Sequence, residues 1–265
     1  MRRTALALIV LLLLAFAGHV LATSEQAYQD YLFQFDLYRQ RETDFRVAKT
    51  EYEKFRSLTS ETTALEKTKA LLAQRAQLLR AYLLVLNEKL NEDRGLTSSE
   101  KALYQRLIQS EIVFLDGHIL LIPAIGSLAD AQKISEQQTD HYDILAAGIR
   151  QTIAGISLGQ LAALAREYDA ALSSAQAIIA ANRGVFTPQK QATLDRWVLS
   201  ISNKRSLYKQ KVDSINQQSS QMKGEIQEIE RTFAQIQKDI AEARQYLAEG
   251  ASFLGELVTA LKYQN

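Results

Sequence analysis

The chain has 265 residues, 31 basic and 30 acidic side chains, no cysteine and a hydrophobic fraction of 47%. This balanced charge gives no electrostatic footprint for nucleic acid or an anionic membrane, so composition argues against both as partners. Without disulfides, packing alone must hold the fold, and a chain of this size buries about 70% or more of its unfolded surface.

Residues 1–22 have the order of a secretory signal peptide. Two arginines precede an uninterrupted apolar run from Ala5 to Ala17, which Gly18 and His19 then break. The segment Val20-Leu21-Ala22 puts small or β-branched residues where a signal peptidase cleaves, so we expect cleavage after Ala22. The segment is also just long enough to span a bilayer as an uncleaved anchor. We therefore predict an exported protein, periplasmic, in the cell envelope or extracellular, which stays membrane-anchored if the leader is retained.

Residues 23–265 are predicted to form an all-α, elongated bundle of about six helices. No segment alternates like a half-buried strand with hairpin residues beside it. In chain order, helices are expected over Ser24–Ser57, from Ala64 to Asp93, from Thr97 to Leu121, from Ser127, from Ser157 to Asn182, and over 188–261.

Capping residues support most of these boundaries. Hydroxyl and carboxylate or amide groups have capping-box spacing in Thr97 with Glu100, Ser127 with Asp130 and Ser157 with Gln160. The polar residues 59–63 are expected to separate the first two helices. Asn182-Arg183-Gly184 predicts a left-handed C-terminal cap, and Thr187-Pro188 predicts the start of the last helix.

The strongest pattern is a seven-residue repeat from Leu194 to Leu261. A 4-3 spacing selects 20 positions, and 17 of them are apolar where the composition supplies about half by chance; the exceptions are Arg205, Ser219 and Gly250. Such a repeat keeps one stripe of a helix against a partner helix, as in a left-handed coiled coil. The mid-repeat positions of this buried seam are Ile226, Ile229, Phe233, Ile236 and Ile240.

Residues 188–261 are predicted to form one long C-terminal coiled-coil helix, because the repeat keeps its phase throughout. Its length would be about 110 Å. The alternative is a turn in the polar stretch 216–224, which would produce two stacked helices.

The first predicted helix is rich in aromatic residues. Eight of them lie between Tyr28 and Phe55, and most fall near one stripe that we expect in the core. Phe33 lies off that stripe, and Trp197 lies beside the seam at Val198. Because aromatic side chains are common at protein interfaces, Phe33 and Trp197 are the predicted interaction residues.

The middle of the chain carries little charge. Residues 144–181 contain four charged side chains and many alanines and glycines, so this stretch is expected at the centre of the bundle. Together with the apolar stretch 119–128, the layout is similar to that of the helical pore-forming toxins of the cytolysin type. That likeness, which has no motif behind it, implies membrane insertion as an alternative function.

Two patterns resemble reactive sites but lack the context that such sites need. Gly155–Gly159 matches a nucleophile elbow around Ser157, which requires a preceding strand and a later histidine. His118 and His141 have acidic neighbours one or two positions away, which do not share a helix face. The two histidines could meet across helices, which leaves a metal site as an alternative. We predict no catalytic residue, no cofactor and no metal ligand.

The sequence therefore predicts an exported, non-enzymatic protein that binds through coiled-coil surfaces, as a scaffold, spacer or holdase. The expected partner is a protein or a second copy of the chain, and not a nucleic acid. Membrane contact is expected only through the N-terminal segment, if it is not cleaved. The alternative is a helical bundle that binds a small ligand or a metal, or that inserts into membranes.

Overall fold

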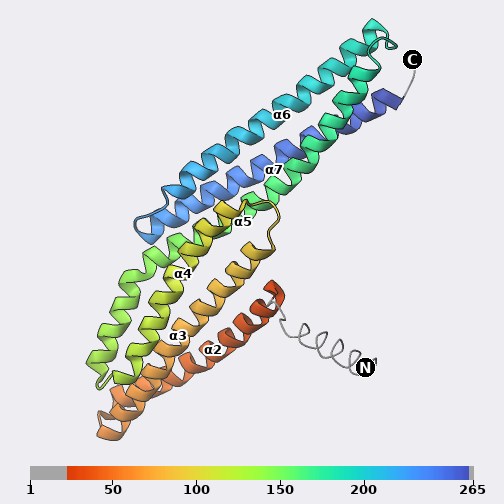
Figure 1. Ribbon diagram of the computed structural model, residues 1–265. Coiled ribbons are helices and arrows are strands. Elements are labelled where there is room, and N and C mark those ends of the chain that lie inside the picture. The colour runs from red at the N-terminus through yellow and green to blue at the C-terminus, as the bar shows by residue number, and fades with distance from the viewer. Residues whose placement is uncertain (1–22, 263–265) are drawn as a thin grey trace, which may run out of the picture.

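The computed structural model describes residues 23–262, so the predicted leader lies outside the described residues. Within this range the chain is helical and contains no strand, which confirms the all-α prediction (Figure 1). The elements are α2 (Ser24–Phe55), α3 (Leu58–Glu92), α4 (Ser98–Leu121), the short 3-10 helix η1 (Ile122–Ala124), α5 (Leu128–Ala181), α6 (Pro188–Ser220) and α7 (Ile226–Lys262).

Helix α5 is the spine of an elongated molecule. Its 54 residues extend over about 80 Å. The first part of α5 packs against α3 and α4, and the last part packs against α6 and α7 (Figure 1). Helix α2 packs extensively against α3 alone. We call α2, α3, α4 and the first part of α5 the first bundle, and α6, α7 and the last part of α5 the second bundle.

Three predicted helix starts are confirmed by their caps. The Thr97 side chain accepts a hydrogen bond from the backbone of Glu100, whose carboxylate accepts one from the backbone of Thr97. Ser127 caps α5, and Thr187 caps α6 ahead of the first-turn proline. Each cap satisfies a backbone donor that has no partner within its helix.

The predicted break at residues 59–63 is wrong. The chain turns earlier, at Arg56, whose φ of 50° lies in the left-handed region. Ser57 then caps α3 through a reciprocal pair of hydrogen bonds with Ser60. The polar residues that follow form the first turns of α3, where the Thr62 hydroxyl donates to a backbone carbonyl one turn earlier.

The predicted helix start at Ser157 is wrong, whereas the helix end predicted at residues 182–184 is correct, because α5 ends at Ala181. Helix α5 runs through Ser157, whose hydroxyl donates to a backbone carbonyl one turn earlier instead of capping a new helix. At the end of α5, Asn182 has φ −110°, so it forms no left-handed cap. Gly155, two residues before Ser157, allows close helix packing, since a methyl group there would lie 2.3 Å from the ring of Tyr104.

The predicted continuous helix over 188–261 is wrong as well. Helix α6 ends at Ser220, and α7 runs back beside it after a turn that contains Gly224 with φ +104° (Figure 1). The repeat nevertheless marks the buried face of both helices, and none of its 20 positions is exposed. Ile229, Phe233 and Ile236 are buried, while Ile226 and Ile240 are partly buried.

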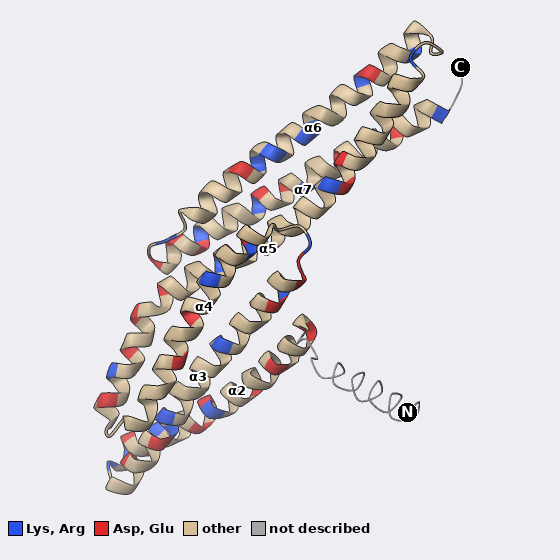
Figure 2. Cartoon of the chain, viewed as in Figure 1, with Lys and Arg blue, Asp and Glu red and all other residues tan. Residues whose placement is uncertain are grey.

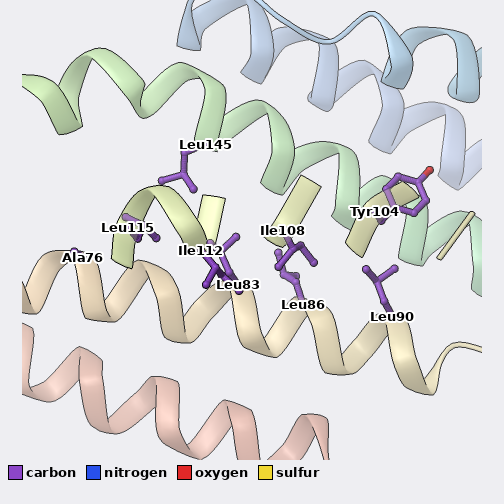
Figure 3. Packing of buried hydrophobic residues seen from close by; sticks show 9 residues of the cluster. All are labelled: Ala76, Leu83, Leu86, Leu90, Tyr104, Ile108, Ile112, Leu115 and Leu145. Atoms are coloured by element: carbon purple, nitrogen blue, oxygen red, sulfur yellow. The ribbon is translucent and has the colours of Figure 1, made fainter. Parts of the chain in front are cut away.

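Each bundle has its own apolar core. In the first bundle, α3, α4 and α5 direct leucine and isoleucine side chains toward one another, as Figure 3 shows for Leu83, Leu90, Leu115 and Leu145. In the second bundle, the seam of α6 and α7 packs against the alanine-rich part of α5. The charge-poor stretch 144–181 therefore lies where the sequence predicted, along the central helix.

One described segment has the length and apolar composition of a membrane span. It is Ser98–Ala124, which comprises α4 and η1, and 33% of its most apolar window is buried in the fold. Its buried side faces α3 and α5, as expected for a core helix of a bundle. Length and composition alone are weak evidence for a membrane location.

Candidate functional site

Helix α2 carries most of the exposed aromatic surface. Among the described residues, five aromatic side chains are exposed, and four of them, Tyr28, Phe33, Phe35 and Phe55, lie on α2. Phe33 is 61% exposed, in agreement with its predicted position off the aromatic stripe. The fifth, Tyr142 on α5, lines the same hollow as Phe35.

The aromatic stripe of α2 only partly enters the core. Its Tyr31 ring packs against Tyr82 of α3 with the ring centroids 5.4 Å apart. The only buried residues of α2 are Ala27 and Ala48. The prediction that this stripe is core is therefore correct for its side that faces α3, while its other side borders open space toward α5.

Two hollows lie over α3 between α2 and α5. The larger, which we call the tip hollow, has a volume of about 560 Å³ and lies near the α2–α3 turn. The wall formed by α2 and its capping residue Arg56 contains three aromatic side chains and three charged ones: Tyr38, Phe45, Tyr52, Lys49, Glu53 and Arg56. Arg75 and Leu71 of α3 form part of its floor, and Leu128, Gln132 and Ser135 of α5 form the opposite wall.

The smaller hollow, which we call the junction hollow, lies where the two bundles meet and has a volume of about 270 Å³. Aromatic rings from α2, α3 and α5 line it. Arg150 of α5 closes one side through an ion pair with Glu230 of α7, 2.7 Å long, and its guanidinium lies over the ring of Phe233. These contacts tie α7 to the first part of α5.

Trp197, the other predicted interaction residue, lies in the packing of the second bundle. Its ring centroid is 5.6 Å from that of Phe253 on α7, and both rings border a cluster that also contains Tyr168 of α5. Trp197 is partly buried there. It thus contacts the other helices of its own bundle rather than forming an open aromatic surface as Phe33 does.

The two histidines flank one aromatic ring inside the first bundle. The Phe114 ring stacks on His141 with centroids 3.6 Å apart and lies 6.2 Å from His118. His141 Nε2 lies 2.7 Å from Oε2 of the buried Glu111. Burial, and secondarily the charge of Arg75, lowers the pKa of His118. Within residues 23–262, no group of three histidine or acidic side chains is placed to hold a metal ion.

Two buried polar residues, Glu111 and Gln138, were not singled out from the sequence, and His118 was considered there only as a possible metal ligand. Glu111 and His118 follow Tyr104 and Ile108 at 4-3 spacing on α4, so the period that marks a buried face includes them. Gln138 stands seven residues from the buried Leu145 on α5. Its amide oxygen and nitrogen have no hydrogen-bond partner within the described chain, and neither does His118 Nε2. A periodicity search that admits polar residues would have placed all three on buried helix faces.

Comparison with known proteins identified no relative. No family model matches the chain, and no curated protein or solved structure is significantly similar to it.

Proposed function

We propose that this chain is an exported, non-enzymatic binding protein, a rod-shaped scaffold or spacer whose helix α2 contacts a protein partner. The concentration of exposed aromatic side chains on α2 carries this proposal. Aromatic residues are enriched at the energetically dominant positions of protein interfaces.

The packing of α2 leaves these aromatic side chains accessible to a partner. Because α2 packs extensively against α3 alone, one side of α2 faces solvent along much of its length. Burying one exposed phenylalanine, such as Phe33 or Phe55, in an interface is worth about 1.5–3 kcal/mol. Two or three such residues on one helix would therefore contribute several kcal/mol to a contact with a partner.

The second bundle suits the spacer role. Its seam residues are buried against α5, and α5 continues without interruption into the first bundle. A continuous helix fixes the orientation of one bundle relative to the other, whereas a loop between them would allow the two bundles to rotate against each other. We infer that the α6–α7 seam and the adjoining part of α5 act as a coiled-coil stalk.

The reactive-looking residues have local structural roles that support a non-enzymatic function. The Ser157 hydroxyl is bonded within its own helix, and His141 is engaged by Glu111 between α4 and α5. Export rests on the signal-peptide pattern of residues 1–22. The surface supports a protein partner over a nucleic acid, since positive and negative side chains are interspersed along the helices (Figure 2).

Site-specific photocrosslinking in the native host tests the proposal. A photoreactive phenylalanine at position 33 should give one discrete crosslinked product, while the same residue at the exposed Lys209 of α6 should give none. Excess purified chain should compete the product away, and a Phe33→Asp, Phe35→Asp chain of unchanged melting temperature should not. No product at position 33, or equal competition by the double variant, would overturn the assignment of α2 as the contact.

A second candidate function is lipid contact at one end of the rod. The α2–α3 turn and the α4–α5 connection lie at the same end (Figure 1), where Leu58 is 80% and Leu120 is 78% exposed. Liposome leakage and cosedimentation test it: binding lost in a Leu58→Asp, Leu120→Asp chain would support the lipid function. No binding by the unaltered chain would exclude it.

A further inference from the structure

Arg75 is a partly buried arginine without a counter-charge. It lies on α3 at the floor of the tip hollow. Within the described residues it forms no ion pair and no hydrogen bond, whereas Arg80 of the same helix pairs with Asp116 at 2.8 Å. Its guanidinium nitrogens are not among the buried side-chain atoms that lack a partner, so they are open to solvent in the hollow. Arg75 therefore presents N–H donors with no protein counter-charge to any anion that enters the hollow.

The other charged side chains around the tip hollow also leave it short of negative charge. Lys49 and Arg56 bring two further positive charges to its wall, and the only acidic side chain that lines it is Glu53. Glu53 lies 3.9 Å from Lys49, so it does not serve Arg75. The guanidinium of Arg56 lies over the Tyr52 ring. Three cations and one carboxylate therefore face a single cavity, which favours an anion inside it.

The rest of the cavity is mainly apolar, and its volume is that of a small-molecule site. Tyr38 and Phe45 of α2, Leu71 of α3 and Leu128 of α5 surround the charged part. A volume of about 560 Å³ lies within the range of small-molecule sites, roughly 300–1,000 Å³. Such sites combine mainly apolar walls with a few placed polar groups that fix the orientation of the ligand.

We propose that the tip hollow binds a single-chain amphiphile with an acidic head group. The head group, a carboxylate or a phosphate monoester, accepts hydrogen bonds from Arg75, whose planar fork of N–H donors matches both. The apolar chain lies against Tyr38, Phe45 and Leu128. This site is separate from Phe33, so it stands or falls independently of the protein contact proposed above.

Fluorescence binding to the purified full chain tests the proposal, with dansyl-labelled undecanoic acid as the probe. The probe should bind, and palmitate or hexadecyl phosphate should displace it, while the neutral hexadecanol should be at least about tenfold weaker. Which acid displaces more effectively identifies the head group. Equal displacement by hexadecanol, or no binding of the probe, would overturn the proposal.

Two variants locate the site. Arg75→Met should weaken probe binding at least about tenfold, and Arg106→Met, which alters an exposed arginine on α4, should leave it unchanged. Gln132→Trp places a large ring at the exposed rim of the hollow and should exclude the probe while Arg75 is retained. Unaltered binding by either the Arg75 or the Gln132 variant would place the probe elsewhere and contradict the assignment.

Discussion

The two bundles share α5 but differ in whether their buried polar groups have hydrogen-bond partners. In the second bundle, the buried Asp239 accepts hydrogen bonds from Lys211, Gln218 and Gln235. In the first bundle, His118 Nε2 and both amide atoms of Gln138 are buried without a partner, and these are the only such side-chain atoms in the described chain. The two hollows with aromatic walls also border the first bundle.

The difference supports the proposed division of roles between the two bundles. A bundle whose buried polar groups are all satisfied and whose seam is regular is built for stability and stiffness. Unsatisfied polar groups and unfilled space reduce stability, and proteins commonly retain such features where function requires them. The comparison supports the proposal that the first bundle binds and the second bundle gives mechanical support, and each of the following changes tests one side of it.

The largest effect is expected at the seam of the second bundle. Ile229 is 1% exposed, so Ile229→Asp would bury an unpaired carboxylate and should lower the free energy of unfolding by about 3 kcal/mol or more. Glu228→Ala, one position off the seam, is the control and should change little. Urea denaturation measures both. Equal stabilities for the two variants would show that the repeat is not a buried interface.

A smaller loss is expected at Gly250, an exception to the apolar repeat. A methyl group there would lie 2.3 Å from Oη of Tyr168, which donates to the backbone carbonyl of Ile201. Gly250→Ala should therefore cost about 1–3 kcal/mol in thermal unfolding. In Gly255→Ala, on the same helix, the added methyl meets nothing within 4 Å, so helix propensity should stabilise the chain slightly. A neutral Gly250→Ala would contradict the close approach of α5 and α7.

The hydrogen bonds of Asp239 predict a pH dependence in the second bundle. Burial raises the pKa of Asp239, but hydrogen bonds from Lys211 and Gln218 outweigh burial and hold that pKa below its usual range. Its contribution to stability is therefore complete above the unfolded pKa, about 3.9, and is lost as the pH falls through the lower folded value.

Asp239→Asn measures this contribution. The variant should be less stable than the unaltered chain at pH 7 by about 1–2 kcal/mol, and the gap should close as the pH falls below about 4. Denaturant titrations across this range measure it. A gap that stays constant down to the acid limit would contradict the proposed charge-assisted contacts.

The smallest effect is a gain in the first bundle. Gln138 is 2% exposed, so Gln138→Leu removes two unpartnered polar atoms and should raise the free energy of unfolding by about 1 kcal/mol. Gln137→Leu, at the exposed neighbouring position, should change it by less than about 0.5 kcal/mol. A clear loss of stability in Gln138→Leu would mean that the Gln138 amide has hydrogen-bond partners in solution. It would contradict the statement that the first bundle buries polar groups without partners.

Periodicity accounts for what the sequence revealed of the fold. The 4-3 repeat identified the buried face of α6 and α7, because burial depends on spacing along a helix. It did not reveal that the face is divided between two helices. Ser219, Met222 and Ile226 continue the spacing across the turn, and Gly224 with its positive φ is the one strong local signal of reversal.

The residues proposed to bind were harder to predict because their settings depend on distances between helices. The sequence identified Phe33 as lying off the aromatic stripe, which its exposure bears out. Arg75 has no distinguishing neighbours in the sequence, and its lack of a partner emerges only when α2, α3 and α5 are assembled. The helix start predicted at Ser157 was wrong for a related reason. A serine can cap a helix or bond within one in the same local sequence, and the Ser157 hydroxyl bonds within α5.

Hydrogen exchange of the full chain tests the division between the bundles most directly. Helix α2 buries only Ala27 and Ala48, whereas α7 buries eight residues against α5 and α6. The account predicts that backbone amides in the middle of α2 exchange on the order of a hundredfold faster than those in the middle of α7, because α2 opens locally while the second bundle stays closed. Equal protection of α2 and α7 would contradict it.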